Sequence, residues 1–279
     1  MFAYRHYFHA GNFADVYKHA ALAQLITHFQ QKEKPMVYVD THSGVGQYDL
    51  QHEWAQKNKE YALGVERIFG IRDYPEELEP YLSVLRNVNL NGELKRYPGS
   101  PYIARQLMRP VDRLILNEFN PVDVEQLTTL CSRWLKTKVH RQDGFEILRS
   151  VLPPIERRGL IFMDSSFDSN NEFNRIEKAI IAGHKKFSTG VYAVWYPISD
   201  GIDSTVLFQN FRALLRKPIL RGEIYLSSSE LGGRMNACGL VVINPPYTFD
   251  VKLGAVGDWL VERLDPSGAG RTDVEFFEP

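Results

Sequence analysis

Four acidic residues follow short apolar runs of the sequence, where their side chains could contact a common ligand. Asp40, Glu118, Asp143 and Asp164 each end or directly follow such a run. Ligands of open parallel sheets bind outside the carboxyl ends of the strands, so we expect these acids to lie near one another. Each acid alone is equally well explained as a helix N-cap or a turn residue. Four acids that each lie at the end of an apolar run favour a ligand site.

The chemistry of these positions favours a nucleoside that carries a cation and no phosphate. Glu118 can accept hydrogen bonds from two adjacent ribose hydroxyls. Asp143 can accept a hydrogen bond from the exocyclic amine of adenine while Gly144 leaves room for the ring, and Asp40 can hold an ammonium group. So many acids would repel a pyrophosphate. We therefore expect S-adenosylmethionine, a nucleoside with a cationic amino-acid tail, as the cofactor.

Two glycines, Gly44 and Gly46, follow Asp40 in the segment VDTHSGVG. Without a Cβ atom, the backbone can bend sharply there and approach a ligand closely. The segment lacks the third glycine of a dinucleotide fingerprint, and no Lys-Ser/Thr pair follows it as in a P-loop. This pattern disfavours a nicotinamide oxidoreductase.

The elements that must position these residues alternate between strands and helices, which predicts a doubly wound α/β fold with a mostly parallel sheet. Apolar runs predict strands at 36–40, 112–118, 137–143, 159–164, 190–198, 222–229 and 239–245. Apolar residues at three- and four-residue spacings predict helices at 121–135, 172–184, 203–215 and 251–264. Residues 47–109 have helical spacing and no strong strand, so we expect a helical insertion within a single domain that spans residues 1–279.

Composition restricts the class of protein. The chain has 279 residues, 44% of them hydrophobic, and two distant cysteines, Cys131 and Cys238, which suit a reducing compartment. No apolar run reaches the roughly 20 residues of a membrane span, and no signal peptide is evident. His6, His9 and His19 lack a recognisable fourth zinc ligand. We expect a cytoplasmic monomer with no metal and no membrane contact.

Four segments carry a resemblance to a known family: YRHYFHAGNFADVYKHA from Tyr4, VDTHSGVG, YPGSP from Tyr97, and LNE ending at Glu118. Over nearly its full length, the chain resembles the bacterial RlmJ family, class I methyltransferases that modify adenine N6 in 23S ribosomal RNA with S-adenosylmethionine. The resemblance implies a Rossmann-like sheet and an RNA contact at Tyr4. It also implies a cofactor pocket formed by Lys18, His19, His42, Ser100, Glu118, Asp143, Gly144 and Asp164, to which the backbone argument adds Gly44.

The segment Asp164-Ser165-Ser166-Phe167 is the expected catalytic motif. Methyltransferases of exocyclic amines usually have Asp or Asn, two prolines and an aromatic residue there. The side-chain oxygen of the Asp or Asn and a backbone carbonyl oxygen accept hydrogen bonds from the poorly nucleophilic amine, and the aromatic ring stacks on the flipped base. We expect Asp164 and Phe167 to fill these roles, although serines replace the prolines that would fix the backbone φ.

A second candidate for this motif is Asn244-Pro245-Pro246-Tyr247, which has the expected letters. Its strand follows another through a glycine-rich turn, which suits an antiparallel pair. The end of the second strand would then point away from Gly44 and Glu118. We therefore interpret this segment as a strand end that is followed by a helix.

The RNA partner requires a local basic surface, because the net charge of the chain is −1. Beside Tyr4, we expect Arg5 and Arg234 to contact the 23S ribosomal RNA. Two alternatives stay open. One is a methyltransferase of another amine, such as a protein glutamine or a small molecule. The other is a catalytically weakened RNA-binding protein that keeps S-adenosylmethionine as a structural ligand, which the serines at 165 and 166 suggest.

Overall fold

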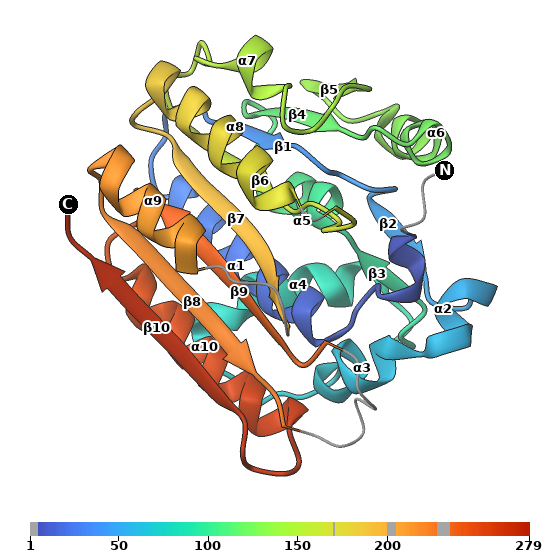
Figure 1. The fold of residues 1–279 in the computed structure, drawn as a ribbon. Helices are drawn as coiled ribbons and strands as arrows, with labels where there is room; N and C mark the ends of the chain where they lie inside the picture. The colour runs from blue at the N-terminus through green and yellow to red at the C-terminus, as the bar shows by residue number, and fades with distance from the viewer. Residues whose placement is uncertain (1–4, 170, 200–204, 228–234) are drawn as a thin grey trace.

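A twisted eight-stranded sheet forms the centre of the molecule (Figure 1). The computed structural model describes residues 5–169, 171–199, 205–227 and 235–279. The strand order is β10-β8-β9-β7-β6-β1-β4-β5. The strands are β1 (Val37–Asp40), β4 (Arg113–Asn117), β5 (Thr137–His140), β6 (Gly159–Met163), β7 (Val191–Ile198), β8 (Ile219–Tyr225), β9 (Ala237–Ile243) and β10 (Arg271–Phe277). Strands β5, β4, β1, β6 and β7 run parallel to one another, whereas β9 is antiparallel to β7 and β8, and β10 is antiparallel to β8.

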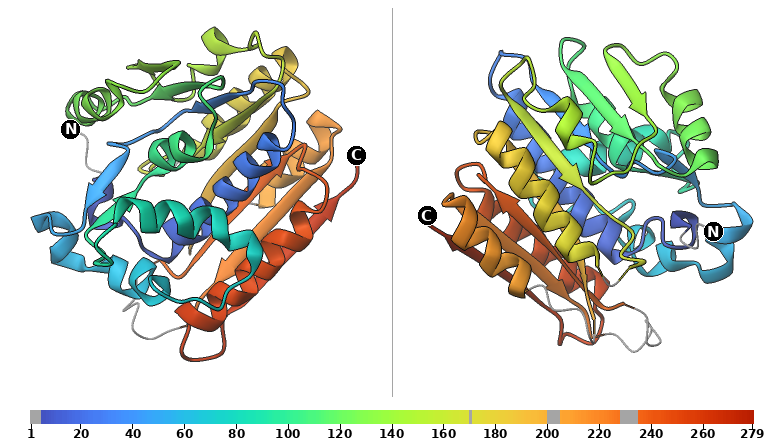
Figure 2. Two further views of the ribbon diagram at one scale, coloured as in Figure 1. Left: turned by 180° about the vertical axis from the view of Figure 1, so that it is seen from behind. Right: turned by 45° about the horizontal axis from the view of Figure 1, so that its top comes forward.

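The central strands are buried on both faces, which explains their continuous apolar runs. Alternate side chains of β1 enter different cores: Tyr38 packs on one face, and Val37 and Val39 on the other. One face is covered by α1 (Phe13–Gln30), α4 (Glu79–Val88), α5 (Ser100–Leu107), α6 (Pro121–Cys131) and α10 (Phe249–Leu264). The other is covered by α7 (Leu148–Val151), α8 (Glu172–Lys186) and α9 (Thr205–Leu215) (Figure 2). The prediction of a doubly wound, mostly parallel sheet is confirmed.

The strand register places the carboxyl ends of β1, β4 and β6 side by side, where a ligand was expected. Asp40, the last residue of β1, pairs with Leu116 of β4 on one side and Phe162 of β6 on the other. The chain runs outward from β1 to β4 and β5, then returns to β6, so the strand order reverses beside β1. Such a switch point is where open α/β sheets bind their ligands.

The segment at residues 47–109 contains helical elements and a small sheet. The helical elements are α2 (Glu53–Asn58), η2 (Glu60–Leu63), α3 (Val65–Ile68), η3 (Glu76–Leu78), α4 and α5. Strands β2 (Gln47–Asp49) and β3 (Arg96–Pro98) form an antiparallel pair that the sequence did not indicate. Three-residue strands are too short to give an alternating pattern.

Helices α1 and α7, strand β10 and the 3-10 turn η1 (His6–Phe8) lie outside the predicted set. Helix α1 is buried on nearly all sides, so its apolar residues mark no single face. Strand β10 closes the far edge of the sheet against β8. The turn η1 precedes α1. Among the described residues, no helix has the length and apolar content needed to cross a membrane.

Candidate active site

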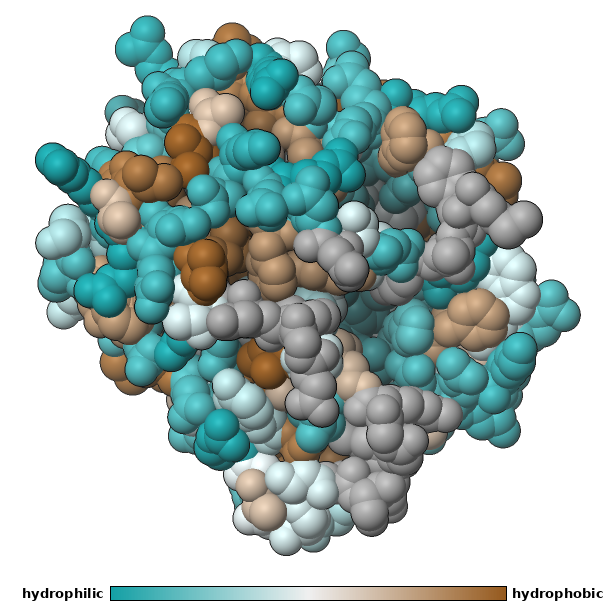
Figure 3. All heavy atoms as spheres, in the orientation of Figure 1, coloured by the Kyte–Doolittle hydropathy of each residue, from teal (hydrophilic) through white to brown (hydrophobic). Residues whose placement is uncertain are grey.

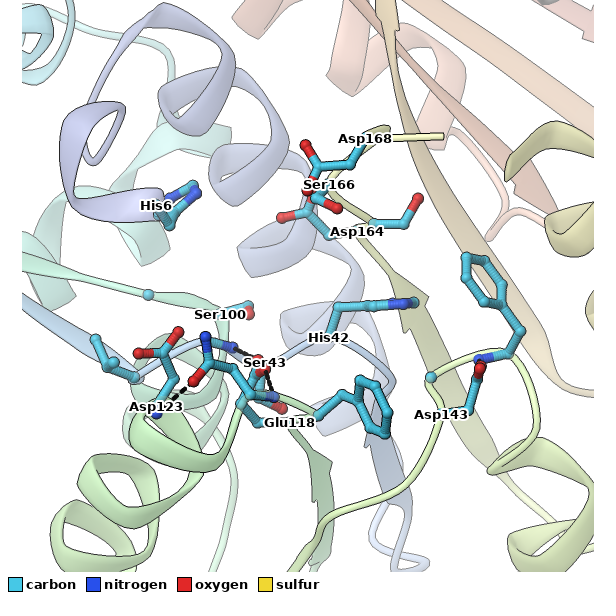
Figure 4. Close-up of a pocket in the computed structure, with 18 of the residues that line it drawn as sticks. His6, His42, Ser43, Ser100, Glu118, Asp123, Asp143, Asp164, Ser166 and Asp168 are labelled. Carbon is cyan, nitrogen blue, oxygen red and sulfur yellow. Dashed lines mark hydrogen bonds between the residues drawn. The ribbon is translucent and has the colours of Figure 1, made fainter. Parts of the chain in front are cut away.

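A pocket of about 260 Å³ opens at the carboxyl ends of β1, β4, β5 and β6. In the orientation of Figure 1, the surface is hollowed near this edge among mostly hydrophilic side chains (Figure 3). Eight of the nine predicted cofactor residues line the pocket: His19, His42, Gly44, Ser100, Glu118, Asp143, Gly144 and Asp164. Figure 4 shows several of them around one space, with Glu118 and Asp143 on different sides of His42. The ninth, Lys18, lines an adjoining pocket instead.

Asp40 lies beneath the pocket and supports its wall. Its side chain is fully buried, and Oδ2 accepts hydrogen bonds from Ser100 Oγ at 2.7 Å and Tyr38 Oη at 2.9 Å. Burial raises the pKa of Asp40 to about 7, against these hydrogen bonds, which lower it. Asp40 is not among the residues that line the pocket, so the suggestion that it holds an ammonium group does not fit. Its role here is to fix Ser100, the first residue of α5.

Gly44 and Glu118 form one rigid corner of the pocket. Gly44 has φ +57°, which favours glycine, and its amide donates to Glu118 Oε2 at 2.8 Å. The amide of Asn120 donates to Oε1, also at 2.8 Å. Burial raises the pKa of Glu118, while these backbone hydrogen bonds lower it. Both carboxylate oxygens are fixed in place, and each keeps a lone pair for a ligand hydroxyl.

Gly144 makes room for a side chain of the protein. A Cβ atom at Gly144 would lie 2.4 Å from Nε2 of His42 and 2.6 Å from the carbonyl oxygen of Thr41. The expected space for a ligand ring is therefore occupied on this side by the imidazole. Burial lowers the pKa of His42 to about 4, although the charge of Asp143 raises it, so the imidazole is neutral at pH 7.

Arg175 of α8 is a pocket residue that the sequence did not predict. Its guanidinium donates to Asp143 Oδ2 and lies 4.1 Å from the ring centroid of Phe145. The other carboxylate oxygen of Asp143 accepts from the amide of Phe145 at 3.0 Å. Helical spacing marked α8, but nothing in its pattern indicated that this arginine reaches the acid after β5.

Lys18 is buried between two carboxylates. Its Nζ lies 2.8 Å from Asp15 Oδ1 and 2.5 Å from Asp164 Oδ2, and 5.1 Å from the ring centroid of Trp195. Burial raises the pKa of Asp15, but the charges of His6 and Lys18 outweigh it and hold that pKa well below its usual range. Asp15 was missed from sequence, because an acid in the first turn of a helix is ordinarily a capping residue.

A second pocket of about 330 Å³ adjoins the first, and the two share His6 and Ser166. Its walls include Lys18, Asp15 and Trp195 together with the apolar side chains of Phe13 and Leu63. Asp164 lines the first pocket and is ion-paired to Lys18 of the second. The acid after β6 therefore lies where the two pockets meet.

Phe167 differs from the ring that the motif predicts. It is in contact with the core and lines neither pocket. Its ring centroid lies 5.2 Å from that of Phe173 and 5.8 Å from that of Trp195. Trp195 of β7 is the large aromatic side chain that borders the second pocket, and it was not among the predicted site residues.

The motif at Asn244 lies beside the amino-terminal end of β7, away from the carboxyl ends of the parallel strands that form the pocket, as expected. Strand β9 is antiparallel to β7, and its last residue, Ile243, pairs with Tyr192 near the start of β7. The Asn244 side chain donates to the carbonyl oxygens of Ser188 at 3.0 Å and Gly190 at 2.7 Å. It therefore closes a loop between elements.

Of the three predicted RNA contacts, Tyr4 and Arg234 lie outside the described residues. Arg5 is described: its Nη1 lies 3.2 Å from Asp123 Oδ1, and its guanidinium lies 5.5 Å from the ring centroid of Trp54. Asp123 lines the first pocket, so Arg5 lies beside it.

Each of the three histidines near the N-terminus, His6, His9 and His19, has a protein partner. His6 Nε2 lies 3.0 Å from Asp15 Oδ2, and His9 Nδ1 lies 3.0 Å from Glu60 Oε2. His19 Nδ1 lies 2.8 Å from the hydroxyl of Tyr97. Burial lowers the pKa of His19 to about 3. Its imidazole is therefore a neutral part of the pocket wall at pH 7.

Comparison with known proteins gives matches over the whole chain. The profile of a family described as "Ribosomal RNA large subunit methyltransferase D, RlmJ" matches residues 33–277. Ribosomal RNA large subunit methyltransferase J of Escherichia coli (strain K12) is 39% identical over 280 residues, which cover 100% of both chains. The protein of the same name from Haemophilus influenzae is 37% identical with the same coverage. The crystal structure of protein LPL1258 from Legionella pneumophila is 38% identical with a TM-score of 0.88, covering 96% of this chain and 98% of that one.

Proposed function

We propose that this chain, which belongs to the RlmJ family of ribosomal RNA large subunit methyltransferases, methylates the N6 amine of an adenosine in 23S ribosomal RNA. The chain is an S-adenosylmethionine-dependent methyltransferase of ribosomal RNA.

The first pocket fits S-adenosylmethionine. The fixed carboxylate of Glu118 suits the ribose hydroxyls, and the amides of Gly44 and Asn120 hold that carboxylate in place. Asp143 and Asp164 also line the pocket, and although Arg175 and Lys18 pair with them, each carboxylate can still accept a hydrogen bond from an amine or ammonium group of the ligand. Arg175 is held by Asp143, so it adds little attraction for a phosphate. When bound, S-adenosylmethionine supplies the electrophilic methyl group of the reaction.

The second pocket suits the adenosine that accepts the methyl group. Trp195 and Phe13 offer apolar surface to a base that has left its stack, and Ser166 joins this pocket to the first. Asp164 lies at the junction, where its carboxylate can accept a hydrogen bond from an exocyclic amine. Its position at the meeting point of both pockets is the single observation that carries the proposal.

Lys18 orients Asp164, the acid that accepts a hydrogen bond from the amine of the adenosine. The ion pair to Nζ fixes Asp164 Oδ2, which leaves Oδ1 to accept from the amine. The carbonyl oxygen of Ser165 is the second acceptor that we propose, since two acceptors can hold both amine protons and align the nitrogen lone pair with the methyl group. Such positioning supplies most of the rate in reactions of this kind.

Methyl transfer to RNA tests the proposal. We would incubate the protein with labelled S-adenosylmethionine and deproteinised 23S ribosomal RNA, then digest the RNA to nucleosides. We expect label in N6-methyladenosine, lost in Asp164→Ala and partly kept in Asp164→Asn, which retains an acceptor oxygen. Label in another nucleoside or in a protein would refute the assignment of adenine N6 as the substrate. Cofactor binding without methyl transfer would instead support a catalytically weakened RNA-binding protein.

The variant Asn244→Ala is the matched control for the motif assignment. Asn244 lies beyond the amino-terminal end of β7, away from both pockets. We expect its transfer rate to match that of the unchanged protein. Loss of transfer in Asn244→Ala alone, with Asp164→Ala active, would move the catalytic motif to the other edge of the sheet.

A further inference from the structure

The loop after β6 keeps a strained shape without the prolines that would restrain it. Phe167 has φ +54°, a left-handed conformation that side chains other than glycine seldom adopt. Ser165 and Ser166 precede it and leave the backbone free to rotate about φ. Some other contact must therefore hold the loop that carries Asp164 and the Ser165 carbonyl.

Glu172 makes that contact. It is the first residue of α8 and is buried, with 6% of its surface exposed. Its Oε2 accepts a hydrogen bond from the amide of Phe167 at 2.8 Å. Its own amide donates to the carbonyl oxygen of Ser169 at 3.1 Å. Two hydrogen bonds of one residue thus tie the loop to the start of α8, the side-chain bond at Phe167, which has the strained φ, and the backbone bond at Ser169.

We propose that Glu172 is a positioning residue for methyl transfer, which replaces by a side-chain hydrogen bond the backbone restraint that prolines would give at 165 and 166. The proposal rests on the proposed function of this site. The restraint acts through the loop: Asp164 lies at one end and the strained Phe167 at the other. If Phe167 turned, the carbonyl of Ser165 would move relative to Asp164, and the two proposed acceptors would no longer face one amine.

Substitutions at Glu172 separate its hydrogen bond from its charge. Glu172→Gln keeps an acceptor oxygen for the Phe167 amide and removes the charge, whereas Glu172→Ala removes both. We expect kcat to fall about tenfold or more in Glu172→Ala, because small misplacements of reacting groups carry large rate costs. We expect Glu172→Gln to stay within about threefold of the unchanged protein, and KM for RNA to change little in either variant. Equal loss of kcat in both variants would overturn the proposal.

Prolines introduced into the loop give the sharper test. The amides of Ser165 and Ser166 donate no hydrogen bond to another described residue, so prolines there would remove none, and neither residue has a positive φ, which proline cannot adopt. In a Ser165→Pro/Ser166→Pro background, we expect Glu172→Ala to cost less than about threefold in kcat. If the loss is as large with the prolines as without them, Glu172 does not act through the loop backbone, and the proposal fails.

Glu177→Ala is the matched control, because Glu177 lies on the same helix and accepts from Asn210 on α9 instead of the loop. Its kcat should be unchanged. If Glu172→Ala does not fold, Glu172→Asp tests the same hydrogen bond with a side chain that is shorter by one methylene. We then expect a smaller loss that the prolines again remove, and an unchanged kcat in this variant would contradict the proposal.

Amide hydrogen exchange gives a readout that does not depend on catalysis. In the protein without cofactor or RNA, the Phe167 amide should exchange faster in Glu172→Ala and remain protected in Glu172→Gln. Equal protection in the two variants would overturn the positioning role, whatever the activity. Absence of methyl transfer by the unchanged protein, with the expected exchange pattern, would instead refute the proposed function and leave the loop restraint intact.

Discussion

At the scale of single residues, the ion pairs of Lys18 dominate the site. A cation that is 4% exposed lies between two carboxylates, and its ammonium contacts both. Removing one member of a buried charge group leaves the others without compensation. The arrangement therefore couples the stability of the fold to the position of Asp164.

We predict that Lys18→Met, which keeps the length of the side chain, destabilises the protein by about 3–5 kcal/mol. Methyl transfer should fall about 100-fold or more, because Asp164 loses its orientation. Urea denaturation and a transfer assay would measure the two effects. Lys95→Met is the control: Lys95 pairs with Glu93 at an exposed site, so neither quantity should change. A stable and active Lys18→Met protein would contradict the role of the pair.

The buried carboxyl of Asp40 predicts a distinct dependence of stability on pH. Its pKa rises from an ordinary value of 3.8 to about 7 in the folded protein. Between these values the folded state binds a proton that the unfolded state releases, so this group's contribution to the free energy of unfolding falls as pH rises. Relative to Asp40→Asn, the unchanged protein should therefore be more stable at pH 5 than at pH 8.

Urea denaturation of both proteins at the two pH values checks this, since contributions common to both cancel in the difference. Asp112→Asn is the control. Burial raises the pKa of Asp112, but hydrogen bonds from Arg109 and from the amide of Met36 lower it below its ordinary value. The contribution of Asp112 to the free energy of unfolding is therefore fully present above pH 5. The difference in this free energy between Asp112→Asn and the unchanged protein should be the same at pH 5 and pH 8. A difference for Asp40→Asn that is independent of pH would disprove the assignment.

At the scale of elements, the sequence located those strands whose two faces are both buried. β1 and β6 are apolar without interruption because helices cover both sides. Helix α1 was missed for the same reason, since burial on nearly all sides removes the polar face that would reveal its period. The strands β2 and β3 are too short to show a pattern.

The candidate site was predictable to the extent that its residues follow strands. The acids after β4, β5 and β6 meet because parallel strands end at one edge, and their positions can be read from the chain. Asp15, Arg175 and Glu172 enter the site from helices, so only the packing of α1 and α8 on the sheet determines what they contact. Asp40 was predicted to hold a ligand ammonium group, but Ser100 of α5 covers it, and the packing of that helix could not be read from the sequence either.

The start of α1 links this helix to the segment that follows β1. Asn12 caps the helix: its Oδ1 accepts from the amide of Asp15 at 2.9 Å, and its Nδ2 donates to Glu60 Oε2 at 3.1 Å. We predict that Asn12→Ala destabilises the protein by about 1–2 kcal/mol and lowers methyl transfer, since the first turn of α1 carries Asp15. Asn87→Ala, at an exposed position of α4, should leave both quantities unchanged. Equal stability of the two variants would exclude the capping role.

At the scale of the whole molecule, a net charge of −1 cannot attract RNA by itself, so binding depends on where the cations lie. The rim of the first pocket carries Asp123 and Asp168, which repel phosphate. Arg5 lies beside Asp123, and 28% of its side chain is exposed. It can therefore offset the acid near the entrance while its guanidinium keeps a face on Trp54.

We predict that Arg5→Ala weakens the affinity for 23S ribosomal RNA several-fold and reduces the slope of log affinity against log salt by about one, as expected when one phosphate contact is lost. Affinity for S-adenosylmethionine should stay the same, because Arg5 does not line the first pocket. Arg271→Ala is the control: Arg271 pairs with Asp273 on β10, at the sheet edge opposite β5. Its salt slope should equal that of the unchanged protein. If Arg5→Ala gives that same slope, RNA does not contact this side of the pocket, and the charge of Arg5 serves only to neutralise Asp123.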